Sequence, residues 1–144
     1  MSIDTFAKET RKIIEHENSL ENNRIQWMLI AEGLLFTAFG VLLQSNSLKG
    51  IAVKLFTIII SIAGIVIAYS CGVHLKHGRR AIENALKNFD EQRKDVEYNG
   101  PSIIGLDVTK LDNFERHSIP PYILPKTFVL AWIAIDLIIL KNIH

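Results

Sequence analysis

Apolar residues gather along this chain in three long runs that carry almost no charge. Residues 55–73 contain no Asp, Glu, Lys or Arg. The run before them holds a single carboxylate, Glu32, and the run near the C-terminus holds another, Asp136. A helix needs about 20 consecutive apolar residues to cross the hydrocarbon core of a bilayer. We therefore predict three membrane spans, at residues 25–44, 53–75 and 123–141.

The alternative is a soluble bundle built from three buried helices. Buried helices of soluble proteins usually keep a polar stripe along one side. Residues 55–73 have no charged side chain at any angle around the helix. The pattern therefore favours an integral membrane protein over a soluble one.

The segments that flank the first two runs are amphipathic. Residues 1–24 place apolar side chains at intervals of three and four, with Ser2 or Asp4 as the expected N-cap. Residues 76–98 repeat this helical pattern and stop near a Tyr-Asn-Gly-Pro turn signal. The apolar face of this second segment consists of Ala81, Ile82, Ala85, Leu86 and Phe89.

Joined to the spans, these segments predict two long helices, at about residues 3–44 and 51–97. Each helix would be about 60–70 Å long, which is roughly twice the hydrocarbon thickness of a bilayer. Their inner halves should therefore project beyond the bilayer and pack on each other through their apolar faces. The expected fold is all-α: an integral membrane helical bundle with a long two-helix hairpin that extends into the cytoplasm, and a third transmembrane helix.

The distribution of Lys and Arg predicts the topology. These residues are concentrated before the first span and between the second and third spans. Because cytoplasmic segments of membrane proteins are rich in Lys and Arg, we expect a cytoplasmic N-terminus and a cytoplasmic loop at residues 99–122. The connector at residues 45–52 should lie outside. No cleavable signal is visible, so the chain is expected to be a multi-pass protein of the inner (plasma) membrane.

Composition argues against several kinds of function. The net charge of +1 and the scattered basic residues argue against nucleic-acid binding. Cys71, His74 and His77 recur at intervals of three, so at most two of them could reach one metal ion. The sequence holds no Ser/His/Asp arrangement, phosphate-binding glycine loop or CxxC motif. We therefore expect a non-enzymatic protein with no metal and no cofactor.

Glu32 is the first candidate functional residue, because an ionisable side chain inside a bilayer is costly and often functional. It could line a pore, carry a proton or bind a cation. It could instead be a protonated, hydrogen-bonded packing residue. The expected hairpin register places it near Ala63, Gly64, Ala68 and Tyr69, and the Tyr69 hydroxyl could then be its partner.

Asp136 is the second candidate for a pore, proton or ion site. It should lie nearer the outer face than Glu32, by roughly one or two helical turns, so the two acids are not expected to share one ion within a subunit. The plainer interpretation of Asp136 is a carboxylate near the membrane surface that water can reach. Tyr122 and Trp132 are expected to anchor the third span at the membrane surface.

Small residues on the first two spans are candidates for helix packing. Gly64, Ala68 and Gly72 are spaced by four on the second span. Gly33, Thr37 and Gly40 give a similar face on the first. Small residues allow helix backbones to approach closely inside a bilayer. Whether these faces meet within one subunit or between subunits is left open by the sequence.

One segment carries a family resemblance. The chain leads into the first span with Glu17-Asn18-Ser19-Leu20-Glu21-Asn22-Asn23-Arg24-Ile25-Gln26-Trp27 and continues with Gly33-Leu34-Leu35-Phe36. This resembles a pattern, E-N-x-L-x-x-N-R-x-x-W, of small uncharacterised bacterial multi-span membrane proteins. More loosely, the expected layout is similar to that of two-span membrane effectors of bacterial defence systems. The second resemblance implies an activity that breaches membranes.

Two hypotheses of function follow. The first is a small homo-oligomeric bacterial membrane protein whose subunits surround a pore, with Glu32 facing the interior of the oligomer. The second is a membrane-anchored adaptor that binds a cytoplasmic or membrane partner through its cytoplasmic helices. In both, the lipid bilayer surrounds the spans and nucleic acid is not a partner.

Overall fold

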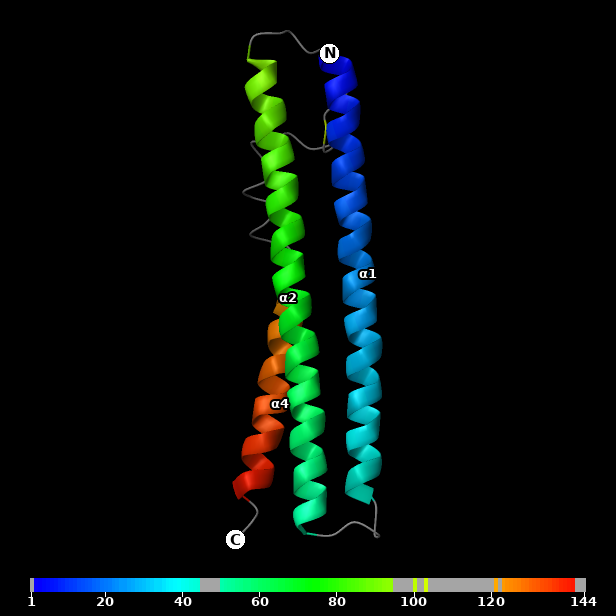
Figure 1. Cartoon of the computed structure of the whole chain (residues 1–144), viewed down its shortest axis with the longest axis vertical. Helices are drawn as coiled ribbons and strands as arrows, with labels where there is room; N and C mark the ends of the chain where they lie inside the picture. The colour runs from blue at the N-terminus through cyan, green and yellow to red at the C-terminus, as the bar shows by residue number, and fades with distance from the viewer. Residues whose placement is uncertain are drawn as a thin grey trace. The chain divides into compact units, whose positions relative to one another are not determined.

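In the computed structural model, the described residues form three helices: α1 (Ile3–Gln44), α2 (Ile51–Arg93) and α4 (Ile123–Lys141) (Figure 1). The structure describes residues 2–44, 50–94, 100, 103, 121 and 123–141, without the side chain of Leu140. The described residues contain no strand. The all-α fold class and the two long helices are thereby confirmed.

The predicted N-cap of α1 is confirmed as Ser2. Its hydroxyl oxygen accepts a hydrogen bond from the backbone N–H of Thr5 at 3.3 Å, and its carbonyl oxygen accepts one from Phe6 N–H at 3.1 Å. Two backbone donors that the first helical turn leaves without a partner are thus satisfied at Ser2. Asp4 lies in this first turn, where a negative charge interacts favourably with the helix dipole.

Gly50 begins the second long helix with a backbone conformation that favours glycine. Its φ is +63°, and its carbonyl oxygen accepts a 3.5 Å hydrogen bond from Lys54 N–H. The helix ends at Arg93, and Lys94 is in a turn, whereas the sequence suggested an end near residue 97. Most of the predicted connector and nearly all of the predicted loop at 99–122, Tyr122 included, lie outside the described residues.

The chain divides into two compact units, one formed mainly by the amphipathic segments and the other by the apolar runs. Unit 1 comprises Met1–Asn23 and Leu75–Pro120, and unit 2 comprises Arg24–His74 and Pro121–His144. The amphipathic halves of α1 and α2 thus belong to unit 1, while all three predicted spans belong to unit 2 almost in full. The second half of α1, the first half of α2 and α4 lie side by side in unit 2 (Figure 1).

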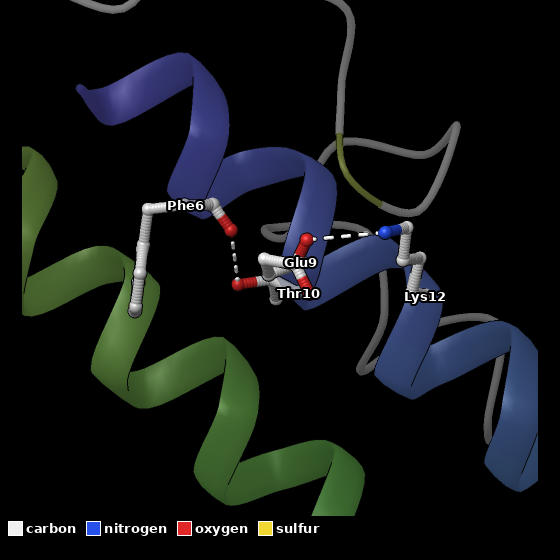
Figure 2. A network of polar contacts seen from close by, with 4 residues as sticks. All are labelled: Phe6, Glu9, Thr10 and Lys12. Atoms are coloured by element: carbon white, nitrogen blue, oxygen red, sulfur yellow. Dashed lines mark hydrogen bonds and ion pairs between the residues drawn. The ribbon is translucent and has the colours of Figure 1, made fainter. Parts of the chain in front are cut away.

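Unit 1 is held by contacts between the apolar faces of α1 and α2, as the sequence predicts. The rings of Phe6 and Phe89 stack with centroids 6.2 Å apart and an angle of 7°. Thr10 is buried, and its hydroxyl donates a 3.0 Å hydrogen bond to the carbonyl oxygen of Phe6. Figure 2 shows the Phe6 side chain reaching towards α2, while Glu9 and Lys12 form a 3.1 Å ion pair on the exposed side. Such an exposed pair contributes little stability.

The expected partner-binding face of α2 lies within this packing. Phe89 is 3% exposed, and the remaining four residues of the face are half-buried: Ala81, Ile82, Ala85 and Leu86. The face therefore contributes to the core of unit 1.

Candidate functional site: a polar core inside an apolar unit

The outer surface of unit 2 is apolar. With the exception of Ile13, every large hydrophobic side chain that is exposed among the described residues belongs to this unit. Both α1 and α2 contain a stretch that is long and apolar enough to cross a membrane, and only 17% and 22% of those stretches are buried inside the chain. The core helix of a soluble protein would be mostly buried. Soluble monomers rarely expose large contiguous apolar patches, so this many exposed large hydrophobic side chains in one unit is unusual for a soluble monomer.

The inside of unit 2, by contrast, contains polar side chains. Glu32 of α1 and Thr57 and Ser61 of α2 each have 0% of their surface exposed. Buried polar groups are costly without hydrogen-bond partners, and a buried carboxyl group is especially so. We call Glu32, Thr57, Ser61 and the half-buried Asp136 the polar core.

Glu32 is bound by a residue of the third helix. The indole Nε1–H of Trp132 donates a 2.7 Å hydrogen bond to Oε2 of Glu32. The other carboxyl oxygen, Oε1, is buried and has no hydrogen-bond partner. The carboxyl group of Glu32 is therefore half satisfied, and Oε1 retains an unused capacity for a hydrogen bond or a positive charge.

Aromatic packing fixes the indole of Trp132 in this position. Its ring stacks on Phe36 at a centroid distance of 4.4 Å and an angle of 10°, and Phe39 meets it edge-on at 6.2 Å. Phe36 follows Glu32 by one helical turn on α1, so one face of that helix supplies both the acceptor and the stacking partner. Trp132 is 0% exposed.

The third helix can approach α2 this closely because Gly64 has no side chain. A Cβ atom at Gly64 would overlap Nε1 of Trp132 and lie 2.6 Å from its Cε2. The same ridge of small residues continues to Gly72, where a Cβ would lie 3.5 Å from Cβ of Pro125. The predicted ridge of Gly64, Ala68 and Gly72 thus packs within one subunit, with both of its glycines against α4.

A second polar contact joins α4 to α2 one turn further along. Ser61 donates a 2.8 Å hydrogen bond from its hydroxyl to Oδ1 of Asp136, which follows Trp132 by four residues. Thr57 lies one turn from Ser61 on the same face of α2 and donates to the carbonyl oxygen of Val53 at 2.9 Å. The polar core therefore forms a line of side chains along the inside of unit 2.

Apolar residues close this line towards the Arg24 end of unit 2. Met28, Ala68 and Cys71 are 8% exposed or less and lie between Glu32 and the level of Arg24. At that level the guanidinium Nη1 of Arg24 donates to the carbonyl oxygen of His74 at 3.3 Å. The polar core is therefore sealed at this end in the conformation described.

The small-residue face of the first span, unlike the ridge of Gly64 and Gly72, does not pack against another of the described helices at its glycines. No heavy atom lies within 4 Å of a Cβ built on Gly33 or on Gly40. Thr37 is exposed and donates its hydroxyl to the carbonyl oxygen of Gly33 at 2.8 Å. This face of α1 therefore points away from the packing of unit 2.

Two sequence-based expectations about aromatic residues are wrong. Tyr69 is 69% exposed and is not the partner of Glu32, because Trp132 donates that hydrogen bond. Trp132 itself is at the centre of the unit and not at its surface. The exposed aromatic side chains among the described residues of unit 2 are instead Trp27, at 72%, Tyr69, at 69%, and Phe56, at 47%.

The hydroxyl groups of Thr57 and Ser61 were not predicted as part of the site. Their spacing of four places both on one face of α2, and Gly64, three residues beyond Ser61, adjoins that face. Glu32 and Asp136 have different hydrogen-bond partners, Trp132 for the first and Ser61 for the second. That the two acids do not share an ion stays a prediction.

Metal-binding groups are not gathered in the described part of the chain, where no three His, Cys, Asp or Glu side chains are close enough to hold a metal ion. Cys71 donates weakly to the carbonyl oxygen of Arg24 at 3.7 Å, and the His74 ring nitrogen Nδ1 pairs with the carbonyl oxygen of Ser70 at 2.7 Å.

Comparison with protein-family models, curated proteins and solved structures finds no match. The resemblance carried by residues 17–27 stays a prediction.

Proposed function

We propose that this is an integral membrane protein whose unit 2 spans the bilayer and whose polar core forms a path for a monovalent cation, the proton included. One observation carries the proposal: fully buried Glu32, Thr57 and Ser61 lie inside a unit that exposes many large apolar side chains. Apolar side chains on the outside can contact lipid, and polar side chains on the inside can line a path for an ion.

Helix geometry supports a bilayer around unit 2. At 1.5 Å per residue, Glu32 lies about 12 Å along α1 from Arg24, and Asp136 lies about 6 Å beyond Trp132 along α4. The acids would then lie on either side of the middle of a hydrocarbon core about 30 Å thick. Exposed Trp27, one turn from Arg24, would lie near the membrane surface, where tryptophan is favoured.

The chemistry of the polar core favours a cation over an anion. Its groups are two carboxyl groups and two hydroxyl groups, which present oxygen atoms to an ion. Oxygen Oε1 of Glu32 has no partner and could take a proton, a hydrated cation or a water molecule. Because Trp132 and Phe36 fill the space beside Glu32, the conformation described corresponds to a closed path.

The pore hypothesis from the sequence is changed in one respect. Glu32 packs against α4 inside the subunit, so in this proposal the path runs through unit 2 and not along an axis shared by several copies. Self-association stays part of the proposal, through the outward face that holds Gly33, Thr37 and Gly40. The stoichiometry of the protein in nanodiscs tests this part separately.

The orientation is proposed from the distribution of charge. Unit 1 would lie in the cytoplasm and unit 2 in the inner membrane, because Lys and Arg are concentrated in unit 1. The adaptor hypothesis has less support, since the apolar face around Phe89 is used in the packing of unit 1.

Cation flux into liposomes that contain the purified protein tests the proposal. We expect the wild type or Gly64→Ala to pass H⁺ or K⁺ faster than protein-free liposomes do. Gly64→Ala is included because the new methyl group would overlap Trp132, so the indole must move away from Glu32. Glu32→Gln, introduced into the conducting protein, should change the flux at least fivefold. Glu83→Gln is the matched control, because this exposed acid pairs with Arg79 in unit 1.

Separate measurements with H⁺ and with K⁺ as the only permeant cation distinguish the two ions. Flux that is equal in protein-free and protein-containing liposomes, for the wild type and for Gly64→Ala, would exclude a cation path. Flux that Glu32→Gln leaves unchanged would exclude the polar core as its route.

A further inference from the structure

We infer that α4 is a movable gate over the polar core, with Trp132 as the side chain that seals it. This inference rests on the proposed cation path and says how that path is opened and closed. Release of α4 from α1 and α2 would open the path, and docking of α4 would close it.

Helix α4 contributes polar partners to both of the other helices of unit 2. The hydrogen bond to Glu32 comes from Trp132, and the acceptor for the Ser61 hydroxyl is Asp136, so α4 supplies the partner of each of these two buried side chains. On α4 these two residues are four apart and therefore share one face of the helix. The third helix thus covers polar groups that belong to both of the other helices.

Helices associate only weakly inside a bilayer. Lipid tails are as apolar as the side chains of a helix, so no hydrophobic driving force holds α4 in place. The contacts that hold it include close packing at Gly64 and Gly72, the aromatic stack on Phe36, and the hydrogen bonds made by Trp132 and Asp136. A contact of this kind is reversible, and a minor undocked state is expected at equilibrium.

Undocking of α4 would leave polar groups of α1 and α2 without their partners. Without α4, Glu32 loses the donor to Oε2 while Oε1 still has no partner, and Ser61 loses its acceptor. A carboxyl group and a hydroxyl group would then line the space that the indole of Trp132 has left. Because such groups are costly in contact with lipid, water or a cation is drawn into this space.

Gly72 and Pro125 provide a place to lock the gate without touching the polar core. A Cβ at Gly72 would lie 3.5 Å from Cβ of Pro125, which is at the short end of the spacing in disulfides. These positions are about two helical turns from Gly64 and Trp132. A disulfide between cysteines at 72 and 125 would therefore hold α4 on α2 and leave Glu32 unchanged.

The test uses Gly72→Cys/Pro125→Cys in a protein that also carries Gly64→Ala, to favour release of Trp132, and Cys71→Ser, to remove the native thiol. We expect the oxidised protein to pass cations at least tenfold more slowly than the reduced one, and the reductant to restore the flux. The two proteins with only one of the new cysteines should show no such redox effect. A mass shift after alkylation measures the extent of cross-linking.

The outcomes separate the gate from the path. Flux that depends on Glu32 but is equal in the oxidised and reduced proteins would overturn the gate and leave the cation path intact. Failure of the two cysteines to cross-link in the protein with Gly64 restored would contradict the docked position of α4 and overturn the gate. Absence of flux in both redox states would overturn the cation path and the gate with it.

A matched pair of substitutions at Trp132 separates its ring from its N–H group. Trp132→Phe keeps an aromatic ring for Phe36 and removes the donor to Glu32, whereas Trp132→Ala removes both. If the ring is the seal, Trp132→Ala raises the flux at least tenfold and Trp132→Phe raises it less. Equal flux in wild type and Trp132→Ala would overturn the assignment of Trp132 as the seal.

Discussion

Trp132 donates a 2.7 Å hydrogen bond to Glu32 although 100 positions of sequence separate the two residues. Neither side chain has any exposed surface. The contact joins the third helix to the first and gives the buried carboxyl group its partner. It therefore connects the packing of unit 2 with the chemistry proposed for it.

Gly64→Ala should destabilise unit 2, because the new methyl group would meet Cε2 of Trp132 at 2.6 Å. Overpacking of this kind costs about 1–3 kcal/mol in the free energy of unfolding. Gly72→Ala is the control, since its methyl group would lie at an ordinary 3.5 Å from Pro125. Reversible unfolding in mixed detergent micelles measures both. Equal stability of the two variants would show that the indole is not packed on Gly64.

The hydrogen bond between Ser61 and Asp136 should be measurable by a double-mutant cycle with Ser61→Ala and Asp136→Leu. Hydrogen bonds between membrane helices contribute about 0.6 kcal/mol on average and up to about 1.7 kcal/mol, so a coupling energy in this range is expected. Asp136→Asn keeps an oxygen acceptor for Ser61 and should lose less stability than Asp136→Leu. A coupling energy of zero would indicate that the two side chains do not interact in the bilayer.

Phe6 and Phe89 should stabilise unit 1 through their stacked rings. We expect a coupling energy of about 0.5–1.5 kcal/mol between Phe6→Ala and Phe89→Ala. Hydrogen exchange of the amide groups in the two helices of unit 1 reports this stability. Ile13→Ala is the control on the same helix. Because Ile13 is 46% exposed, this substitution should reduce the stability of unit 1 far less than either Phe substitution. Additive effects of the two Phe substitutions would contradict the stacking.

Much of the fold follows from the sequence because it depends on periodic patterns. The apolar runs and the amphipathic segments predict the helices that the structure contains, and Ser2 predicts the start of α1. Both faces of unit 1 were identified from spacing alone, since side chains three or four residues apart share one side of a helix. Helix formation depends on local patterns of side chains, so such patterns predict most of the helix bounds, although α2 ends at Arg93 and not near residue 97.

The arrangement of the candidate site was not predictable in the same way. Glu32 stands out in the sequence as a single acid in an apolar run, but its partner Trp132 lies on another helix. A tryptophan in a span is usually read as an anchor at the membrane surface, and only the missing side chain of Gly64 allows the indole to enter the core. Which faces of three helices meet depends on such long-range packing, which a single sequence does not encode in a local pattern.

Contact of the two tryptophans with lipid tests the central claim, that unit 2 lies in the bilayer with an apolar outside and a polar inside. Trp27 is 72% exposed and Trp132 is 0% exposed. In vesicles of brominated lipid, which quench a tryptophan on contact, fluorescence of the wild type should fall. In Trp27→Phe, where Trp132 is the one remaining tryptophan, the brominated lipid should leave the fluorescence almost unchanged. Strong quenching of Trp132, or no quenching of Trp27, would contradict the account.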